Sequence, residues 1–137
     1  METTPMKQTV VIATKSAMDL VRQAKSEIEN LTPEEANEER LTGTVAMIDV
    51  READELQQGY IPGAINAPRG MIEFYADPSL PYYKPAFTKD KRLILYCASG
   101  GRSALTAQTL EEMGYNNVSH IDGGFKAWQA ANLPVSK

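Results

Sequence analysis

The one cysteine of this 137-residue chain, Cys97, stands directly before a short run of small residues. Four of them separate it from Arg102, in the order Ala98, Ser99, Gly100, Gly101. Adjacent glycines let the backbone curl tightly with its N–H groups turned inward, and such a turn binds anions. A helix that begins at the turn adds the positive end of its dipole. We therefore expect an anion cradle around the thiolate of Cys97, which makes it a nucleophile without a general base.

The other reading of Cys97 is a buried structural cysteine, which is a common state of this residue type. The glycine-rich turn favours the reactive state. His120, the one histidine, lies among apolar residues, and we expect a hydrogen-bonded core residue rather than a catalytic base. One cysteine and one histidine cannot form an internal disulfide or fill a zinc site. We predict no metal and no cofactor.

The elements that position Cys97 follow from hydrophobic patterning. Apolar runs typical of strands buried on both faces of a parallel sheet occur at residues 45–50, 65–67, 93–96 and 118–121. Helical segments lie between and after them, at residues 53–58, 103–113 and 125–131. This alternation predicts an α/β fold. Cys97 then lies at the carboxyl end of a strand, where open α/β sheets bind ligands.

Two further segments lack recognisable chemistry. Residues 15–40 predict polar helices, one of them starting at Thr32 with Glu35 completing a capping box. We predict that residues 1–42 form a helical extension packed on a domain of residues 43–137. Residues 70–90 are rich in proline and aromatic residues and predict an irregular surface loop. A second hypothesis is that this loop borders the site around Cys97 and selects the molecule that accepts a group from it.

Charge and hydropathy restrict the partners. The net charge of -4 argues against nucleic acid, which requires a basic face. No apolar run approaches the ~20 residues of a membrane span, and the N-terminus lacks the apolar core of a signal peptide. A lone thiol suits a reducing compartment. We expect a cytoplasmic protein without nucleic-acid or membrane partners.

Three segments of the chain resemble the rhodanese family. One is the loop from Cys97 to Arg102. Another is residues 59–64, Gly-Tyr-Ile-Pro-Gly-Ala, which are similar to the family's Gly-His-Ile-Pro-Gly-Ala segment. The third is residues 123–128, which match its Gly-Gly-Phe/Trp-x-x-Trp signature. The resemblance covers roughly residues 43–135. It implies a rhodanese-like fold with a central, mostly parallel five-stranded sheet and helices on both faces.

The resemblance also implies an activity. Rhodaneses take a sulfane sulfur from a donor such as thiosulfate, hold it as a cysteine persulfide, and pass it to cyanide or a thiol. Cys97 is then the catalytic nucleophile. A small sulfur-donor anion and an acceptor protein thiol are the implied partners. The implied substrate-binding residues are those of the loop, whose amides cradle the sulfur, and two arginines near the mouth: Ala98, Ser99, Gly100, Gly101, Arg102, Arg69 and Arg51.

Arg102 has two interpretations. In one it braces the loop or attracts the donor, and in the other it forms a structural ion pair with Asp49 or Glu52. The chain also departs from the family pattern at two places. Tyr60 stands where histidine is usual, which bears on local packing. The loop side chains between Cys97 and Arg102 carry no charge, whereas many thiosulfate-using members have basic residues there. The donor therefore stays open between thiosulfate and 3-mercaptopyruvate.

Two alternative functions belong to other classes. A non-catalytic rhodanese-like module would bind a partner or sense oxidants through Cys97. Cysteine phosphatases and related arsenate reductases also place a thiolate in a strand–loop–helix cradle. Their loops have five residues between cysteine and arginine, whereas this loop has four. The shorter loop predicts a cradle too small for tetrahedral phosphate and large enough for one sulfur atom.

Overall fold

A parallel sheet forms the centre of the computed structural model, which describes residues 14–137. Its five strands are ordered β1-β5-β4-β2-β3, and every neighbouring pair is parallel. Their bounds are β1 Glu29–Leu31, β2 Val45–Asp49, β3 Ile65–Asn66, β4 Arg92–Tyr96 and β5 Val118–Ile121. The carboxyl ends of all strands therefore meet at one edge of the sheet. The predicted α/β fold and all four predicted strands are confirmed.

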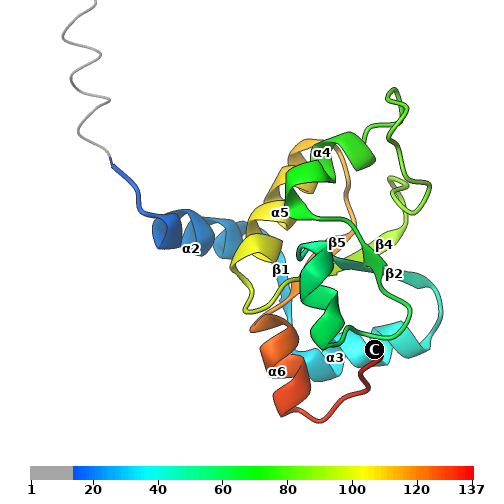
Figure 1. The fold of residues 1–137 in the computed structure, drawn as a ribbon. Coiled ribbons are helices and arrows are strands. Elements are labelled where there is room, and N and C mark those ends of the chain that lie inside the picture. The colour runs from blue at the N-terminus through cyan, green and yellow to red at the C-terminus, as the bar shows by residue number, and fades with distance from the viewer. Residues whose placement is uncertain (1–13) are drawn as a thin grey trace, which may run out of the picture.

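Helices cover both faces of the sheet (Figure 1). One face carries α2 Ala17–Glu27, α4 Ile72–Tyr75 and α5 Gly101–Glu112. The other carries α3 Pro33–Leu41 and α6 Gly124–Ala130. Two short 3-10 helices, η1 Ala53–Gln58 and η2 Arg69–Met71, follow β2 and β3. None of the helices within residues 14–137 combines the length and apolar character needed to cross a membrane.

Strand β4 lies between β2 and β5, and its side chains alternate between the two cores. Leu93 and Leu95 pack in the core under α5, whereas Ile94 and Tyr96 pack in the core under α6. All four are 0% exposed, and full burial of one aliphatic side chain contributes about 1.5–3 kcal/mol. The same alternation directs the next residue, Cys97, toward the α5 face.

The segment before residue 43 is helical only in part. Thr32 and Glu35 form the predicted capping box at the start of α3, with side chain-to-backbone hydrogen bonds of 3.1 and 2.9 Å. The helical prediction is wrong for β1, which pairs with the edge of β5. Three residues are too few to show a hydrophobic period, and this strand is defined by its partner strand. The boundary between an extension of residues 1–42 and a domain of residues 43–137 stays a prediction.

The segment 70–90 begins with a helix rather than a loop. The irregular prediction is wrong for η2 and α4, which cover residues 69–75. After α4 the chain is irregular and is anchored by aromatic residues. Phe87 is fully buried and meets the Tyr115 ring edge to face, with ring centroids 6.3 Å apart. The Tyr115 hydroxyl donates to the carbonyl oxygen of Ala76 at 2.6 Å.

Candidate active site

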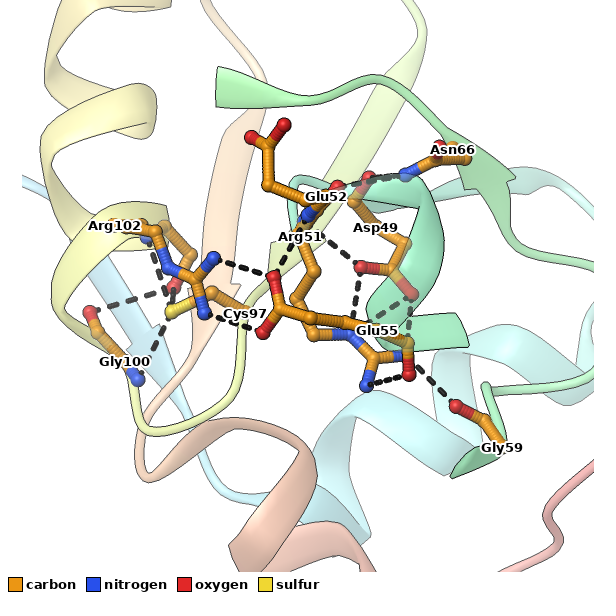
Figure 2. Close-up of polar contacts among 10 residues, drawn as sticks. Asp49, Arg51, Glu52, Glu55, Gly59, Asn66, Cys97, Gly100 and Arg102 are labelled. Atoms are coloured by element: carbon orange, nitrogen blue, oxygen red, sulfur yellow. Dashed lines mark hydrogen bonds and ion pairs between the residues drawn. The ribbon is translucent and has the colours of Figure 1, made fainter. Parts of the chain in front are cut away.

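Cys97 is the first residue after β4, and its sulfur faces the start of α5 (Figure 2). The N–H of Gly100 donates to Sγ at 3.1 Å, and the N–H of Ser103 donates at 3.4 Å. The thiol in turn donates to the Ser103 hydroxyl at 3.6 Å. Cys97 is 1% exposed and packs in the same apolar cluster as Leu95. The sulfur is thus buried, and two backbone N–H groups point at it, one from the N-cap and one from the first turn of α5.

The loop keeps this shape because α6 holds it from outside. Gly100 has φ +108, a conformation that favours glycine, and caps the N-terminus of α5. Phe125 N–H donates to the Cys97 carbonyl oxygen at 2.8 Å, and Lys126 N–H donates to that of Ala98 at 3.0 Å. Gly124 has φ +63, and a Cβ there would lie 2.6 Å from the Cys97 carbonyl oxygen. The glycine pair before Phe125 therefore allows α6 to approach the loop.

Arg102 forms a two-pronged ion pair with Glu55 of η1 (Figure 2). The two N···O distances are 2.8 and 3.0 Å. The predicted ion pair of Arg102 with Asp49 or Glu52 is wrong, because η1 turns Glu55 toward α5. The hydrogen bond from Arg102 lowers the pKa of Glu55 to about 2. The same hydrogen bond raises the pKa of Arg102, and the nearby Cys97 sulfur adds to that rise. Arg102 therefore braces α5 against η1.

Arg51 is 3% exposed, and Asp49 binds its guanidinium with N···O distances of 2.7 to 3.2 Å. The guanidinium also donates to the Gly59 carbonyl oxygen at 2.9 Å. It also lies near two stacked aromatic rings, 4.6 Å from the centroid of Phe125 and 5.6 Å from that of Tyr96. This buried cluster joins the strand end at Asp49 to two of the segments that resemble rhodaneses.

A cavity of about 260 Å³ opens beside the loop. It is lined by Arg51, Glu55, Gln58, Ala98, Phe125, Lys126 and Gln129. Of the predicted substrate-binding residues, Ala98 and Arg51 reach this cavity. Ser99 is exposed on the loop, and Gly101 is the first residue of α5. Arg69 starts η2 outside the cavity lining.

His120 is buried as expected, but its hydrogen bonds lead toward Cys97. Its Nδ1 lies 2.8 Å from the Ser103 hydroxyl, and its Nε2 lies 2.7 Å from Asn30 Oδ1. Burial lowers the pKa of His120 to about 4. Sequence reasoning missed Ser103 and Asn30. Ser103 stands next to Arg102 and offered a signal, whereas Asn30 lies on the strand β1 that local patterning does not predict.

Comparison with known proteins identifies the family. A model of the rhodanese-like domain matches residues 32–131. This chain belongs to the rhodanese family. The match begins just after β1 and includes the loop, η1 and α6. In the part of this rhodanese that the structure describes, no group of three or more His, Cys, Asp or Glu side chains is placed to hold a metal ion.

Individual relatives align over most of this rhodanese. A sulfurtransferase of Allochromatium vinosum is 33% identical over 103 residues, which is 74% of this chain and 89% of that protein. The thiosulfate sulfurtransferase GlpE of Pseudomonas savastanoi is 32% identical over 106 residues, 77% of this chain and 91% of that protein. A solved structure from Rhodopseudomonas palustris is 42% identical with a TM-score of 0.85 and covers 90% of this chain and 96% of its own. That protein is described as having unknown function and as a possible tyrosine phosphatase.

Proposed function

We propose that this rhodanese is a sulfurtransferase that carries a sulfane sulfur as a persulfide on Cys97. Family membership and relatives named sulfurtransferases support sulfur transfer in general. The observation that carries the proposal is the pair of N–H donors, from Gly100 and Ser103, that point at Sγ. These donors stabilise a negative charge on sulfur, and the positive end of the twelve-residue helix α5 adds to them.

In the proposed reaction the Cys97 thiolate attacks the sulfane sulfur of a small anionic donor such as thiosulfate. The Sγ–S bond forms as the donor's S–S bond breaks, and sulfite leaves with the electron pair. The persulfide keeps the negative charge of the thiolate. An acceptor, cyanide or the thiol of a small molecule or protein, then attacks the outer sulfur and returns Cys97 to its thiolate.

We place the approach of the donor in the cavity beside Ala98, which lies next to the loop although Cys97 does not line it. Lys126 lines it, is exposed, and lies in the first turn of α6. An ammonium group at this place attracts a small anion toward the loop. Arg51 lines the cavity with its charge balanced by Asp49. We therefore assign the first attraction of the donor to Lys126, and the holding of the sulfur to the loop amides.

Incubation with thiosulfate or 3-mercaptopyruvate, followed by intact-mass measurement, tests the proposal. We expect a gain of ~32 Da, the mass of one sulfur atom, that cyanide removes. Cys97→Ser should take up no sulfur and should lose thiosulfate-to-cyanide transfer. Sulfur transfer that survives in Cys97→Ser would exclude Cys97 as the carrier. A wild-type protein that takes up no sulfur would favour a non-catalytic module.

Phosphatase activity is the second candidate, because the Rhodopseudomonas palustris relative is described as a possible tyrosine phosphatase. Two features argue against it here. The loop has four residues between Cys97 and Arg102, and Arg102 is engaged by Glu55 instead of facing an empty phosphate site. We expect no hydrolysis of an aryl phosphate. Turnover that depends on Cys97 would reverse the ranking of the two activities.

A further inference from the structure

A chain of hydrogen bonds runs from Cys97 through the buried Ser103 and His120 to Asn30, which is exposed on the edge strand β1. Cys97 Sγ lies 3.6 Å from the Ser103 hydroxyl, and that hydroxyl lies 2.8 Å from His120 Nδ1. His120 Nε2 lies 2.7 Å from Asn30 Oδ1. Parallel pairing of β1 with β5 brings Asn30 next to His120 in register. Cys97, Ser103 and His120 are all buried, so water does not substitute for these partners.

The directions of these hydrogen bonds are fixed from the Asn30 end, at the edge strand β1. The amide nitrogen of Asn30 donates to the carbonyl oxygens of Lys25 at 2.9 Å and Ile28 at 3.2 Å. Its oxygen therefore faces His120 and accepts a proton from Nε2. In a neutral imidazole Nδ1 is then the acceptor, and the Ser103 hydroxyl donates to it. The remaining lone pairs of that hydroxyl face the Cys97 thiol.

We propose that Ser103 and His120 form a proton relay that takes the thiol proton of Cys97 and holds it while the sulfur is bound. Ser103 touches the reacting sulfur, and His120 acts through Ser103 as a positioning residue that stores the proton. The inference rests on the proposed persulfide function and adds to it a path for the proton. Loop amides stabilise the anion on sulfur but cannot accept a proton, so the relay supplies the missing acceptor.

Each proton transfer is balanced along the chain. Before the attack, the Cys97 proton moves to Ser103 Oγ as the Ser103 proton moves to His120 Nδ1, which leaves the thiolate that attacks the donor. Ser103 then donates to Sγ, and the imidazolium donates to Ser103. When the acceptor removes the outer sulfur, the Cys97 thiolate regains its proton through Ser103. Both states leave every donor and acceptor of the relay paired.

The charged groups that face the relay are balanced in pairs. Lys25 of α2 and Asp122 after β5 form an ion pair of 2.9 Å on the His120 side. Arg102 of α5 and Glu55 of η1 form the ion pair on the Cys97 side. Burial lowers the pKa of His120 to about 4, so the free-thiol protein has a neutral imidazole at neutral pH. An anionic persulfide next to Ser103 is the change that favours the imidazolium.

The first test follows His120 by NMR, because the chain has one histidine and one cysteine and each signal reports one site. The titration of the imidazole is compared between the Cys97 persulfide and Cys97 capped with neutral iodoacetamide. We expect the midpoint to rise above about pH 7 in the persulfide, because the imidazole must stay protonated at neutral pH to hold the proton. Ser103→Ala should abolish this difference. Equal midpoints in the two wild-type forms, with the bound sulfur verified by mass, would overturn the relay.

The second test requires no sulfur transfer. We expect Ser103→Ala to slow alkylation of Cys97 by iodoacetamide about tenfold at neutral pH, because the thiol loses its proton acceptor. Ser119→Ala is the matched control, since this buried serine on β5 has a hydroxyl without a hydrogen-bond partner in residues 14–137. It should alkylate like the wild type. Equal rates in wild type and Ser103→Ala would exclude the relay.

A third variant acts in the opposite direction and keeps both relay residues. Asn30→Asp places a carboxylate against Nε2 and should raise the His120 midpoint and speed the alkylation of Cys97. A purely structural His120 would not pass a change at residue 30 on to Cys97.

The outcomes also separate the two proposals. If no sulfur is taken up, the persulfide function fails, and the alkylation rates still decide whether the relay exists.

Discussion

At the scale of single residues, two carboxylates balance the two arginines near the loop. Glu55 binds both terminal nitrogens of Arg102, and the two side chains are 34% and 37% exposed. Arg51 is balanced by Asp49 in the same way, deeper in the protein. Lys126 is the cavity-lining cation without such a partner among residues 14–137. An anionic donor therefore meets less positive charge here than the number of arginines suggests.

Neutralising Glu55 should strengthen donor binding. In Glu55→Gln the Arg102 guanidinium keeps its charge and loses its counter-ion, so we expect the KM for thiosulfate to fall about three- to tenfold with a steeper salt dependence. The rate constant kcat should change little. Asp54→Asn, an exposed acid on the same 3-10 helix, is the control and should leave KM close to wild type. An unchanged KM in Glu55→Gln would show that Arg102 does not attract the donor.

At the scale of secondary structure, the loop after Cys97 depends on its contact with the first turn of α6. Strand β4 ends at the loop and α5 begins in it, while the first N–H groups of α6 bind its carbonyl oxygens. Helix α6 is anchored by Trp128, which is fully buried and donates to the Pro134 carbonyl oxygen at 2.7 Å. The glycines before Phe125 thus serve the loop, although they lie more than twenty residues away in sequence.

Gly124→Ala tests this contact. A Cβ there would lie 2.6 Å from the Cys97 carbonyl oxygen and 2.7 Å from the Ala98 carbonyl carbon, at a φ of +63. Because both contacts are with backbone, we expect a loss of about 2–4 kcal/mol in the free energy of unfolding and slower sulfur uptake. Gly70→Ala meets nothing within 4 Å and should change stability by less than about 0.5 kcal/mol. Urea unfolding of both variants measures these changes. Wild-type stability in Gly124→Ala would show that the close approach of α6 to the loop does not require glycine.

At the scale of the whole molecule, local sequence patterns predict where helices and strands lie. Tertiary contacts decide which strands and side chains pair with one another. The strand around Ile94 and the capping box at Thr32 follow from neighbouring residues alone, and both are found. The strand β1 does not follow, because it is stabilised by β5 and has no period of its own. The same limit applies to Arg102, whose partner depends on how η1 turns. Asn30 shows the consequence most clearly, because an unpredicted strand brings it to His120.

The pH dependence of stability in the free-thiol protein should report this buried histidine. Burial lowers the His120 pKa from 6.5 to about 4 in the folded state, so below pH 6.5 only the unfolded chain takes up the proton. Stability is therefore complete above pH 6.5 and falls as the pH drops to about 4, by about 3 kcal/mol in total. Urea unfolding at several pH values should give a flatter profile for His120→Asn. Carboxylates such as Glu55 titrate in both proteins and cancel in the difference, so parallel profiles would contradict a neutral, buried His120.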